Sequence, residues 1–432
     1  MSNQELEIEQ ADFKQDAEEV AKLATQESAL VEYVPKSKAP YRMNTLIPRN
    51  MAFEVQKSLN SIVKSKGNID NYVRNQLKYE STKQLWSGLG AEQVDAVGLY
   101  LKQFENEQGI IIADQTGIGK GRQAAAVIRH AVMNDYIPVF FTKKPDLFTD
   151  MYRDLKAIGF ENIRPFIVNT DTNAKIKDAD GNVVFSPLSS SAQADLISNE
   201  IEFPTESPES IEYHKKIGKK LPDPDKMPTI KIPLTLDHLP LGYDMIFATY
   251  SQVQSAHPYK RMWIEKMVNN GIDGSKKYKK LIFILDESHM AGGFDSIIGT
   301  WMREVLPQTK ACCFLSATFA KYPEVMPFYA KKTAIAETGL TDSNFVRSMT
   351  SGGLALQEIV ASNLSESGQL IRRQRSNEGI NVDYITLDAE PQRSKSRESV
   401  NRIISLMNDV VAFEQEFVAP LLADVHASAK AQ

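Results

Sequence analysis

The stretch that decides the fold is Gly109–Val132, GIIIADQTGIGKGRQAAAVIRHAV. It begins with an apolar, β-branched run, Ile110–Ala113, which is short enough to be a buried strand. A turn punctuated by glycines follows, and the alanines and aliphatic residues after it have helical spacing. A strand, a glycine-rich loop and a helix in this order are the setting of a phosphate-binding loop, where backbone N–H groups and the positive end of the helix dipole face the phosphates.

Lys120 is the residue of this loop that we expect to contact the terminal phosphates. The pattern G-x-x-x-x-G-K-[ST] is not met at two positions. Asp114 stands at the first glycine, and Gly121 replaces the Ser or Thr whose hydroxyl normally ligates Mg²⁺. A glycine-rich turn without a ligand is the alternative for this stretch taken alone, and the motifs further along the chain make it less favoured.

The composition is that of an ordinary globular protein, with 42% apolar and 24% charged residues in a chain of 432. The net charge of −5 argues against a globally basic nucleic-acid coat, but not against an enzyme with one positive groove. Cys312 and Cys313 are neighbours in an apolar run and are expected to be core residues in a reducing compartment. Because there is no membrane span or signal-peptide pattern, we expect a cytoplasmic location, in the host if the protein is phage-encoded.

Composition and pattern divide the chain into four parts. Residues 1–32 are expected to be an acidic flexible arm, and residues 33–85 a helical N-terminal extension that starts with a proline-marked, extended segment. Residues 86–335 are expected to form the main lobe, with a surface insertion at 170–240. Residues 336–432 are expected to be a C-terminal linker and helical segment.

Strands and helices alternate through the main lobe, which predicts a three-layer α/β fold with a mainly parallel sheet. Further strands are expected at 137–142, 164–168, 243–249, 281–285 and 311–315. Helices are expected at 50–66, 70–77, 89–104, 146–158 and 259–269. A turn signal at 178–182 predicts a hairpin inside the insertion, and a strand at 381–387 and a helix at 397–413 are expected near the C-terminus.

Two adjacent carboxylates, Asp286 and Glu287, follow directly after the apolar run 281–285 and therefore lie at the tip of a buried strand. That position suits one acidic residue on a Mg²⁺ ion and a second one that aligns the attacking water. A purely structural role is difficult to explain, because a partly buried carboxylate needs an opposite charge or hydrogen bonds to offset its lost hydration. Together with the glycine loop, the pair therefore favours nucleotide chemistry.

Other polar residues follow neighbouring strands, and ligands of open α/β sheets bind at that edge. Lys143 and Lys144 come after the strand at 137–142, where they can contact a phosphate backbone or simply be solvated. Ser316 and Thr318 follow the strand at 311–315, and their hydroxyls can hydrogen-bond the acidic pair and relay its state. Each of these signals is weak alone, and their value comes from their order and spacing.

The order DQTGIGKG, ATYS, DESH and SAT resembles the first RecA-like lobe of superfamily 2 helicases and translocases, with DESH as a DEAH-like box. More closely, four segments resemble the strawberry notch family of helicase-like ATPases, of phage, plasmid or bacterial type. The resemblance runs from Tyr33 to Leu387, and that family carries a glycine after the loop lysine. The four segments are GAEQVDAV, ADQTGIGKGRQAA, LDESHMAGG and GGLALQEIVASNLSESGQLIRRQRS.

The resemblance also implies roles for individual residues. Gln93 is expected to read the adenine, Asp286 to hold Mg²⁺ and Glu287 to activate water. Because Gly121 has no hydroxyl, we further expect Asp286 to hold the ion through water, with Thr116 as a substitute ligand. The nucleotide-binding loop would comprise Asp114, Gln115, Thr116, Gly117, Ile118, Gly119, Lys120, Gly121 and Arg122. His289, Ser316 and Thr318 would couple the nucleotide state to a nucleic-acid groove, along which Lys143, Lys144, Thr249 and Tyr250 would lie. The resemblance leaves open whether Arg372, Arg373 and Arg375 face phosphate or form a solvated basic turn.

The implied function is that of an ATP- and Mg²⁺-binding lobe in a DNA-directed helicase-like or translocase-like ATPase, with DNA favoured over RNA. Such motors have a second RecA-like lobe, whose arginine finger contributes a factor of about 10³–10⁵ to the rate. No such lobe fits after Arg375, so we expect this chain alone to bind nucleotide and hydrolyse it poorly. Three explanations stay open: the chain is a fragment, a second chain completes it, or the motor function is lost. The alternatives are a non-catalytic nucleotide- or DNA-binding module of a phage or mobile-element assembly, and an ATPase that remodels protein.

Overall fold

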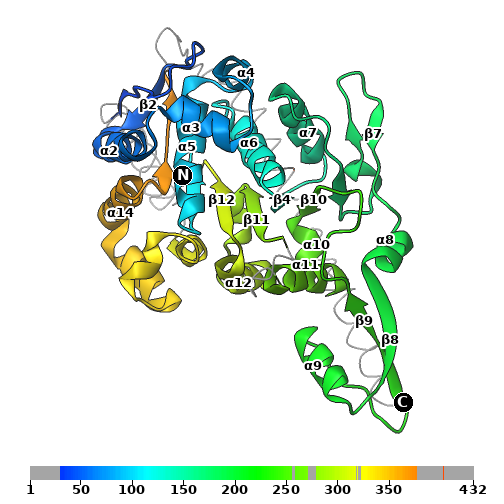
Figure 1. The fold of residues 1–432 in the computed structure, drawn as a ribbon. Helices are drawn as coiled ribbons and strands as arrows, with labels where there is room; N and C mark the ends of the chain where they lie inside the picture. Colours follow the sequence, from blue (N-terminus) through cyan, green and yellow to red (C-terminus); the bar gives the residue numbers. More distant parts are fainter. Residues whose placement is uncertain are drawn as a thin grey trace. The chain divides into compact units, whose positions relative to one another are not determined.

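A seven-stranded sheet lies at the centre of the fold, in the order β13-β3-β12-β11-β4-β10-β5, and every neighbouring pair is parallel (Figure 1). Its strands are Gly109–Ile112 (β3), Ile137–Thr142 (β4), Pro165–Ile167 (β5), Met245–Thr249 (β10), Leu281–Asp286 (β11), Ala311–Leu315 (β12) and Leu370–Ile371 (β13). The strands are apolar and buried almost without interruption, as is typical of a parallel sheet that is covered on both faces.

The computed structural model describes residues 30–254, 258–270, 279–317, 319, 323–376 and 402. The chain up to Ser376 belongs to one unit, and residues 377–432 belong to another. The strand expected at 381–387 therefore lies outside the described residues, as does Thr318. Of the helix expected at 397–413, only Arg402 is described, and it is helical. The described end of the acidic arm, Leu30–Glu32, forms strand β1, so the prediction of a flexible arm is wrong for these residues.

Helices cover both faces of the sheet and make three layers, which confirms the predicted RecA-like α/β fold. Figure 1 shows α5 (Ala91–Glu105), α6 (Lys120–Met133) and α7 (Leu147–Ala157) on one face. The opposite face carries α10 (Tyr250–Gln254), α11 (Pro258–Asn270) and α12 (Ile297–Val305). Cys312 and Cys313 are free and buried in β12, as predicted.

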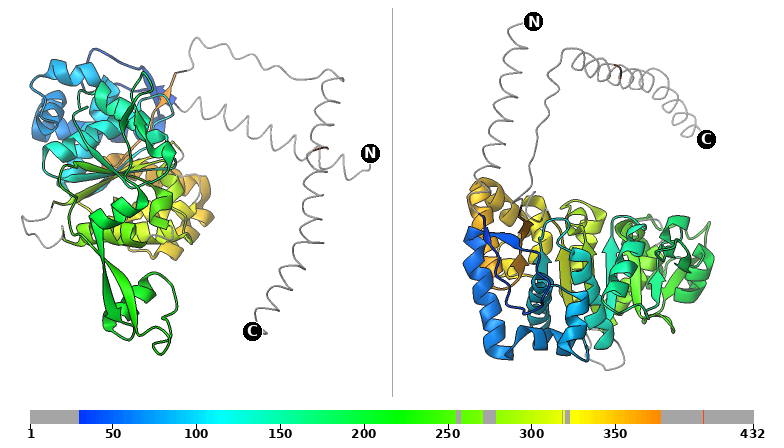
Figure 2. Two further views of the ribbon diagram at one scale, coloured as in Figure 1. Left: turned by 90° about the vertical axis from the view of Figure 1, so that its right-hand side faces the viewer. Right: turned by 90° about the horizontal axis from the view of Figure 1, so that it is seen from above.

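An insertion leaves the sheet after β5 and returns to it at β10. The predicted hairpin is confirmed, because β6 (Ile176–Lys177) pairs antiparallel with β7 (Val183–Phe185). After α8 (Ser190–Ile197), two longer antiparallel strands form an arm that projects from the sheet (Figure 2). The elements of this arm are β8 (Ser198–Pro204), α9 (Pro208–Lys216) and β9 (Thr229–Thr235).

The N-terminal extension packs beside α5 and against residues 342–375. Strand β2 (Thr45–Pro48) lies between β1 and β14 (Gln374–Arg375), and all pairs in this small sheet are antiparallel. Helix α14 (Asp342–Glu366) packs on α2 and bends at Gly353, where φ is 55°. The extension also contains α2 (Arg49–Lys66), α3 (Ile69–Gln76) and α4 (Thr82–Gly88), and α13 (Met326–Ala330) precedes α14.

Buried carboxylates hold the extended segment before β2 in place over α5. Asp95 accepts hydrogen bonds from the Tyr33 hydroxyl (2.7 Å) and from the backbone N–H groups of Lys36 and Ser37 (2.8 and 2.9 Å). Further along, Glu92 accepts from the backbone N–H of Met43 (2.8 Å). Because these bonds fix the backbone on both sides of residue 41, the segment can present side chains to the glycine loop nearby.

None of the helices in the part of the chain that the structure describes has the length and apolar character needed to cross a membrane.

The pKa of Asp95 predicts a pH dependence of stability. Burial raises this pKa to about 6, although the three hydrogen bonds oppose the shift. The folded state therefore holds the proton more tightly than the unfolded chain, so the stability that Asp95 contributes is present below about pH 4 and lost as the pH rises through about 6. The difference in unfolding free energy between wild type and D95N should fall by about 3 kcal/mol between about pH 4 and 7.

Chemical denaturation at several pH values checks this expectation, with D150N, at a half-exposed carboxylate, as the control. A difference between wild type and D95N that stays constant with pH would contradict it.

Candidate functional site

The glycine loop has the conformation that its sequence requires. It connects β3 to α6, and Gly117 and Gly119 have φ angles of 93° and 82°. These angles lie in the left-handed region, which glycine adopts without steric cost. At Gly119 space is also limiting, because an added Cβ would lie 2.2 Å from the amide nitrogen of Gln93. The loop is therefore closed tightly against α5, and Lys120 is the first residue of α6.

Lys120 lies close to both carboxylates of the predicted acidic pair. Its Nζ donates a hydrogen bond to the Asp114 carbonyl (2.6 Å). Burial lowers the pKa of Lys120, and the charges of Asp114, Glu287 and Asp286 oppose this shift. The structure thus brings together Lys120, Asp286 and Glu287, the three residues for which the sequence predicts catalytic roles.

Asp114 has a different use from the one predicted. Its carboxylate is fully buried (0% exposed) and forms an ion pair with Arg373, which is also 0% exposed. The Nε atom and one terminal nitrogen of Arg373 lie 3.0 and 2.6 Å from the two carboxylate oxygens, and Gln123 also donates to one of them (3.1 Å). The nucleotide-binding role predicted for the Asp114 side chain is therefore corrected, because these groups occupy the carboxylate and shield it from the cavity.

The backbone of the loop is held by residues 369–373, the segment that contains Arg373. The N–H groups of Ile111, Ala113 and Gln115 donate in turn to the carbonyls of Gln369, Ile371 and Arg373 (2.7, 2.7 and 2.8 Å). Sheet pairing thus continues beyond β3 into the first half of the loop. Gln115 and Thr116 are exposed on the loop, while Ile118 is buried.

The acidic pair has a strained backbone and defined partners. Asp286 ends β11, and its Oδ2 accepts a hydrogen bond from Thr142 at the end of β4 (3.0 Å). Burial raises the pKa of Asp286, and the hydrogen bond from Thr142 opposes that shift. Glu287 has φ 46° and ψ 48°, a left-handed conformation that is uncommon for a residue with a Cβ and is enriched at functional sites.

A hydrogen-bonded network joins the acidic pair to the end of β12. The Nδ1 atom of His289 lies 2.9 Å from the Ser316 hydroxyl and 3.5 Å from Glu287 Oε2. Ser288, which lies between Glu287 and His289 in the sequence, hydrogen-bonds through its hydroxyl to the Tyr329 hydroxyl (3.1 Å). Tyr329 also hydrogen-bonds to Ser316. His289 and Ser316 thus lie together, as their motifs indicate. Tyr329 carries no motif signal, because it lies in the short apolar helix α13.

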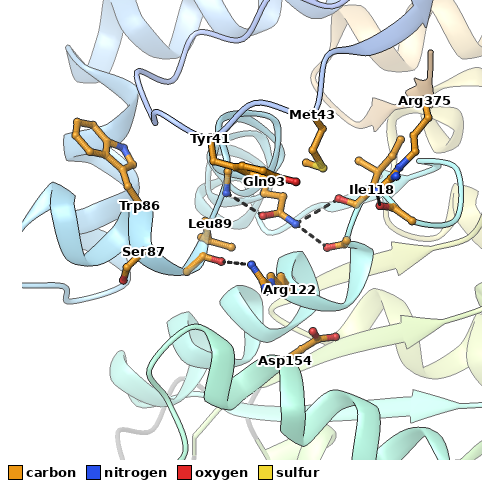
Figure 3. Close-up of a pocket in the computed structure, with 14 residues that line it drawn as sticks. Tyr41, Met43, Trp86, Ser87, Leu89, Gln93, Ile118, Arg122, Asp154 and Arg375 are labelled. Atoms are coloured by element: carbon orange, nitrogen blue, oxygen red, sulfur yellow. Dashed lines mark hydrogen bonds between the residues drawn. The ribbon is translucent and has the colours of Figure 1, made fainter. Parts of the chain in front are cut away.

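A cavity of about 390 Å³ lies on the other side of the loop, against α5 and the N-terminal segment. Gln93 sits in its wall (Figure 3): Oε1 accepts from the Gly90 N–H (2.9 Å), and Nε2 lies 3.3 and 3.2 Å from the carbonyls of Ile118 and Gly119. The amide is thus satisfied within the protein, and it ties α5 to the loop. Other lining residues are Tyr41, Met43, Trp86, Arg122, Asp154 and Arg375.

Asp154 explains why position 121 has no side chain. A Cβ added to Gly121 would lie 2.0 Å from Asp154 Oδ2, so the carboxylate on α7 fills the space where a Ser or Thr would begin. Burial raises the pKa of Asp154, and Arg153 and Arg122 oppose this. Arg122 itself donates to the Gly88 carbonyl (3.3 Å).

The residues predicted to line a nucleic-acid groove divide into two groups. Lys143 and Lys144 are exposed after β4, as that role requires. Thr249 and Tyr250 are only 1% and 4% exposed, so the groove prediction for their side chains is corrected. Asn169 donates to the Thr249 hydroxyl (3.0 Å), whereas Tyr250 donates its own hydroxyl to the Asp286 carbonyl (2.7 Å).

Comparisons with known proteins match part of this chain. Residues 24–201 match a family model described as "P-loop containing NTP hydrolase pore-1", so the match contains the glycine loop and ends before β11. A search of curated proteins gives no match. The solved structures that resemble the chain include the Sulfolobus solfataricus SWI2/SNF2 ATPase core in complex with dsDNA and the SWI2/SNF2 ATPase core domain of the same organism.

Each of these two structures is 14% identical in sequence to this chain and matches 67% of this chain, with a TM-score of 0.38. The chain spans less than half of them, 45% and 44% respectively. The sheet order, the glycine loop and the family match together describe a P-loop NTPase fold with a RecA-like sheet.

The buried ion pair predicts a large effect on stability. Replacing Asp114 by Ala leaves the Arg373 guanidinium buried without a counter-charge, which should lower the free energy of unfolding by about 3–5 kcal/mol. D150A breaks the half-exposed Asp150–Arg153 pair and should cost less than about 1 kcal/mol. Urea denaturation of both variants measures the difference, and equal costs would contradict the importance of the buried pair.

Introducing a hydroxyl side chain at position 121 should lower the stability of the fold. In G121S the new Cβ displaces the Asp154 carboxylate, so we expect a loss of about 1 kcal/mol, at the low end for overpacking because Asp154 can rotate. Removing the obstacle should cancel this loss, so G121S/D154A should match D154A in urea denaturation. A G121S variant as stable as wild type would refute the explanation.

Proposed function

We propose that this chain is the ATP- and Mg²⁺-binding lobe of a DNA-directed, helicase-like or translocase-like ATPase of the strawberry notch type. The observation that carries the proposal is the convergence of Lys120, Asp286 and Glu287 at the carboxyl edge of one parallel sheet, where Lys120 is within electrostatic reach of both acids. Phosphate-binding loops and acidic strand ends meet in this way in P-loop NTPases.

The residues present suit a magnesium nucleotide. No group of three or more His, Cys, Asp or Glu side chains that could hold a metal by themselves occurs among the described residues. Mg²⁺ usually keeps several waters and binds one or two carboxylates together with the phosphates of a substrate, and Asp286 and Glu287 supply two carboxylates at the end of β11. Asp286 would hold the ion through water, with Thr116 as an alternative ligand. The bound ion would neutralise charge that develops on the phosphates.

Within this proposal, each side chain has one task. Lys120 contacts the terminal phosphates, and the glycines at 117 and 119 let backbone N–H groups approach them. Thr142 orients Asp286 through its hydrogen bond. Glu287 accepts the proton of the attacking water and is held in a fixed direction by its left-handed backbone. His289 and Ser316 pass the state of this site to the nucleic-acid surface, on which Lys143 and Lys144 lie.

Nucleotide binding and hydrolysis by wild type, K120A and E287Q test the proposal directly. K120A should lose most of its affinity for ATP, because the point charge on the phosphates is removed. E287Q should keep ATP affinity within about threefold and lose at least about 100-fold in hydrolysis rate, since general-base catalysis typically contributes 10²–10⁴. Measurements with and without DNA report whether turnover depends on nucleic acid.

E209Q is the matched control, because Glu209 is exposed on the α9 arm helix. It should bind and hydrolyse ATP as wild type does. Unchanged ATP affinity in K120A would refute the site, and turnover that survives in E287Q would refute the role of Glu287. If adding DNA leaves the rate of ATP hydrolysis unchanged, the alternative function, an ATPase that remodels protein, is favoured.

A further inference from the structure

Arg375 lines the cavity beside the glycine loop (Figure 3). It belongs to β14, and one terminal nitrogen of its guanidinium donates to the Gly117 carbonyl (2.6 Å). Its backbone N–H donates to the side-chain oxygen of Gln115 (2.9 Å). The strand is thus fastened to the exposed top of the loop, and the guanidinium is held against Gly117 while remaining exposed.

The charge of Arg375 is uncompensated where the structure describes its surroundings. Arg373, two residues earlier, is paired with Asp114, but no carboxylate among the described residues forms an ion pair with Arg375. A guanidinium has five N–H donors, and only one hydrogen bond of this side chain is found within the described chain. A cation with free donors beside a phosphate-binding loop is suited to an anion.

We propose that Arg375 contacts the phosphate chain of the bound nucleotide, as a second cation in addition to Lys120. This inference rests on the proposed nucleotide site and assigns to it a residue whose role the sequence leaves open between phosphate contact and a solvated turn. Lys120 is not among the described residues that line the cavity, so the two cations reach the ligand from different sides of the loop. The planar fork of an arginine pairs with two phosphate oxygens at once, which the free donors of Arg375 permit.

The segment 373–375 therefore has two tasks. Arg373 supports the loop from inside through the buried pair, and Arg375 faces the ligand from outside. Nucleotide binding consequently depends on a segment more than 250 positions away from the loop, since Arg375 and Gly117 are 258 positions apart.

Binding of a ligand series to R375A tests the inference, because it separates phosphate contact from pocket shape. Dissociation constants of wild type and R375A are measured with ATP, ADP, AMP and adenosine, by competition against a fluorescent ATP analogue. We expect affinity for ATP and ADP to fall at least about tenfold in R375A, as for a lost charge-assisted hydrogen bond, and adenosine affinity to change less than about twofold. R375K should recover part of the loss.

R372A is the matched control, since the neighbouring Arg372 is exposed and does not line the cavity. It should bind all four ligands as wild type does. ATP affinity that is unchanged in R375A overturns the inference while leaving the proposed site intact. An equal loss for all four ligands also overturns it, because it indicates a change of pocket shape. Wild type that binds none of the ligands overturns the proposed function and the inference with it.

Discussion

The buried ion pair between Asp114 and Arg373 is the interaction on which the candidate site depends. Both side chains are excluded from solvent, and a charged pair in that position is tolerated only when its geometry and additional hydrogen bonds offset the loss of hydration. Gln123 and the Arg373 backbone N–H supply such bonds to the carboxylate (3.1 and 3.0 Å), and the Glu92 carbonyl accepts from the guanidinium. The pair therefore fixes the entrance of the loop to two other parts of the chain.

This arrangement gives a physical reason for the unusual loop sequence. Where the common phosphate-loop pattern has a flexible glycine, this chain has an acid that anchors a strand from 259 positions away. Where the pattern has a hydroxyl, it has a glycine whose missing side chain makes room for Asp154. Each departure is thus accompanied by a partner from another element, and the loop keeps its left-handed glycines and its lysine.

The candidate site is consequently assembled from three distant segments. The N-terminal segment is held over α5 by Asp95 and Glu92, and it brings Tyr41 and Met43 to the cavity. The loop carries the groups proposed to bind phosphate, and the segment at 369–375 runs beside it as an added strand. Occupation of the site and docking of the segment at 369–375 are therefore expected to stabilise each other, because the segment holds the loop in the conformation that the site uses.

The sequence predicted the parts of this site that depend on local pattern. Strands β4 and β12 begin and end where the apolar runs at 137–142 and 311–315 do, and the loop, α6 and the acidic pair lie where their motifs indicate. Motif order could not give side-chain direction, so Thr249 and Tyr250 were expected at a surface although their side chains point into the protein.

The C-terminal contribution was missed for a different reason. Strands β13 and β14 contain two residues each, which is too short for a periodic signal. Arg373 lies in the basic stretch 372–375, whose composition is typical of a solvated turn. Its burial depends on Asp114, a partner far away in the sequence. No local pattern reports such a pairing, whereas a buried charge of this kind is evident once the fold is known.

The central claim is that the Asp114–Arg373 pair holds the loop in its nucleotide-binding shape. A double-mutant cycle on ATP affinity with D114N, R373Q and D114N/R373Q tests it most directly. The account predicts that each single variant weakens binding and that the double variant is no weaker than the worse single one, because either change already breaks the pair. Wild-type affinity in a single variant, or losses that simply multiply in the double variant, would contradict it.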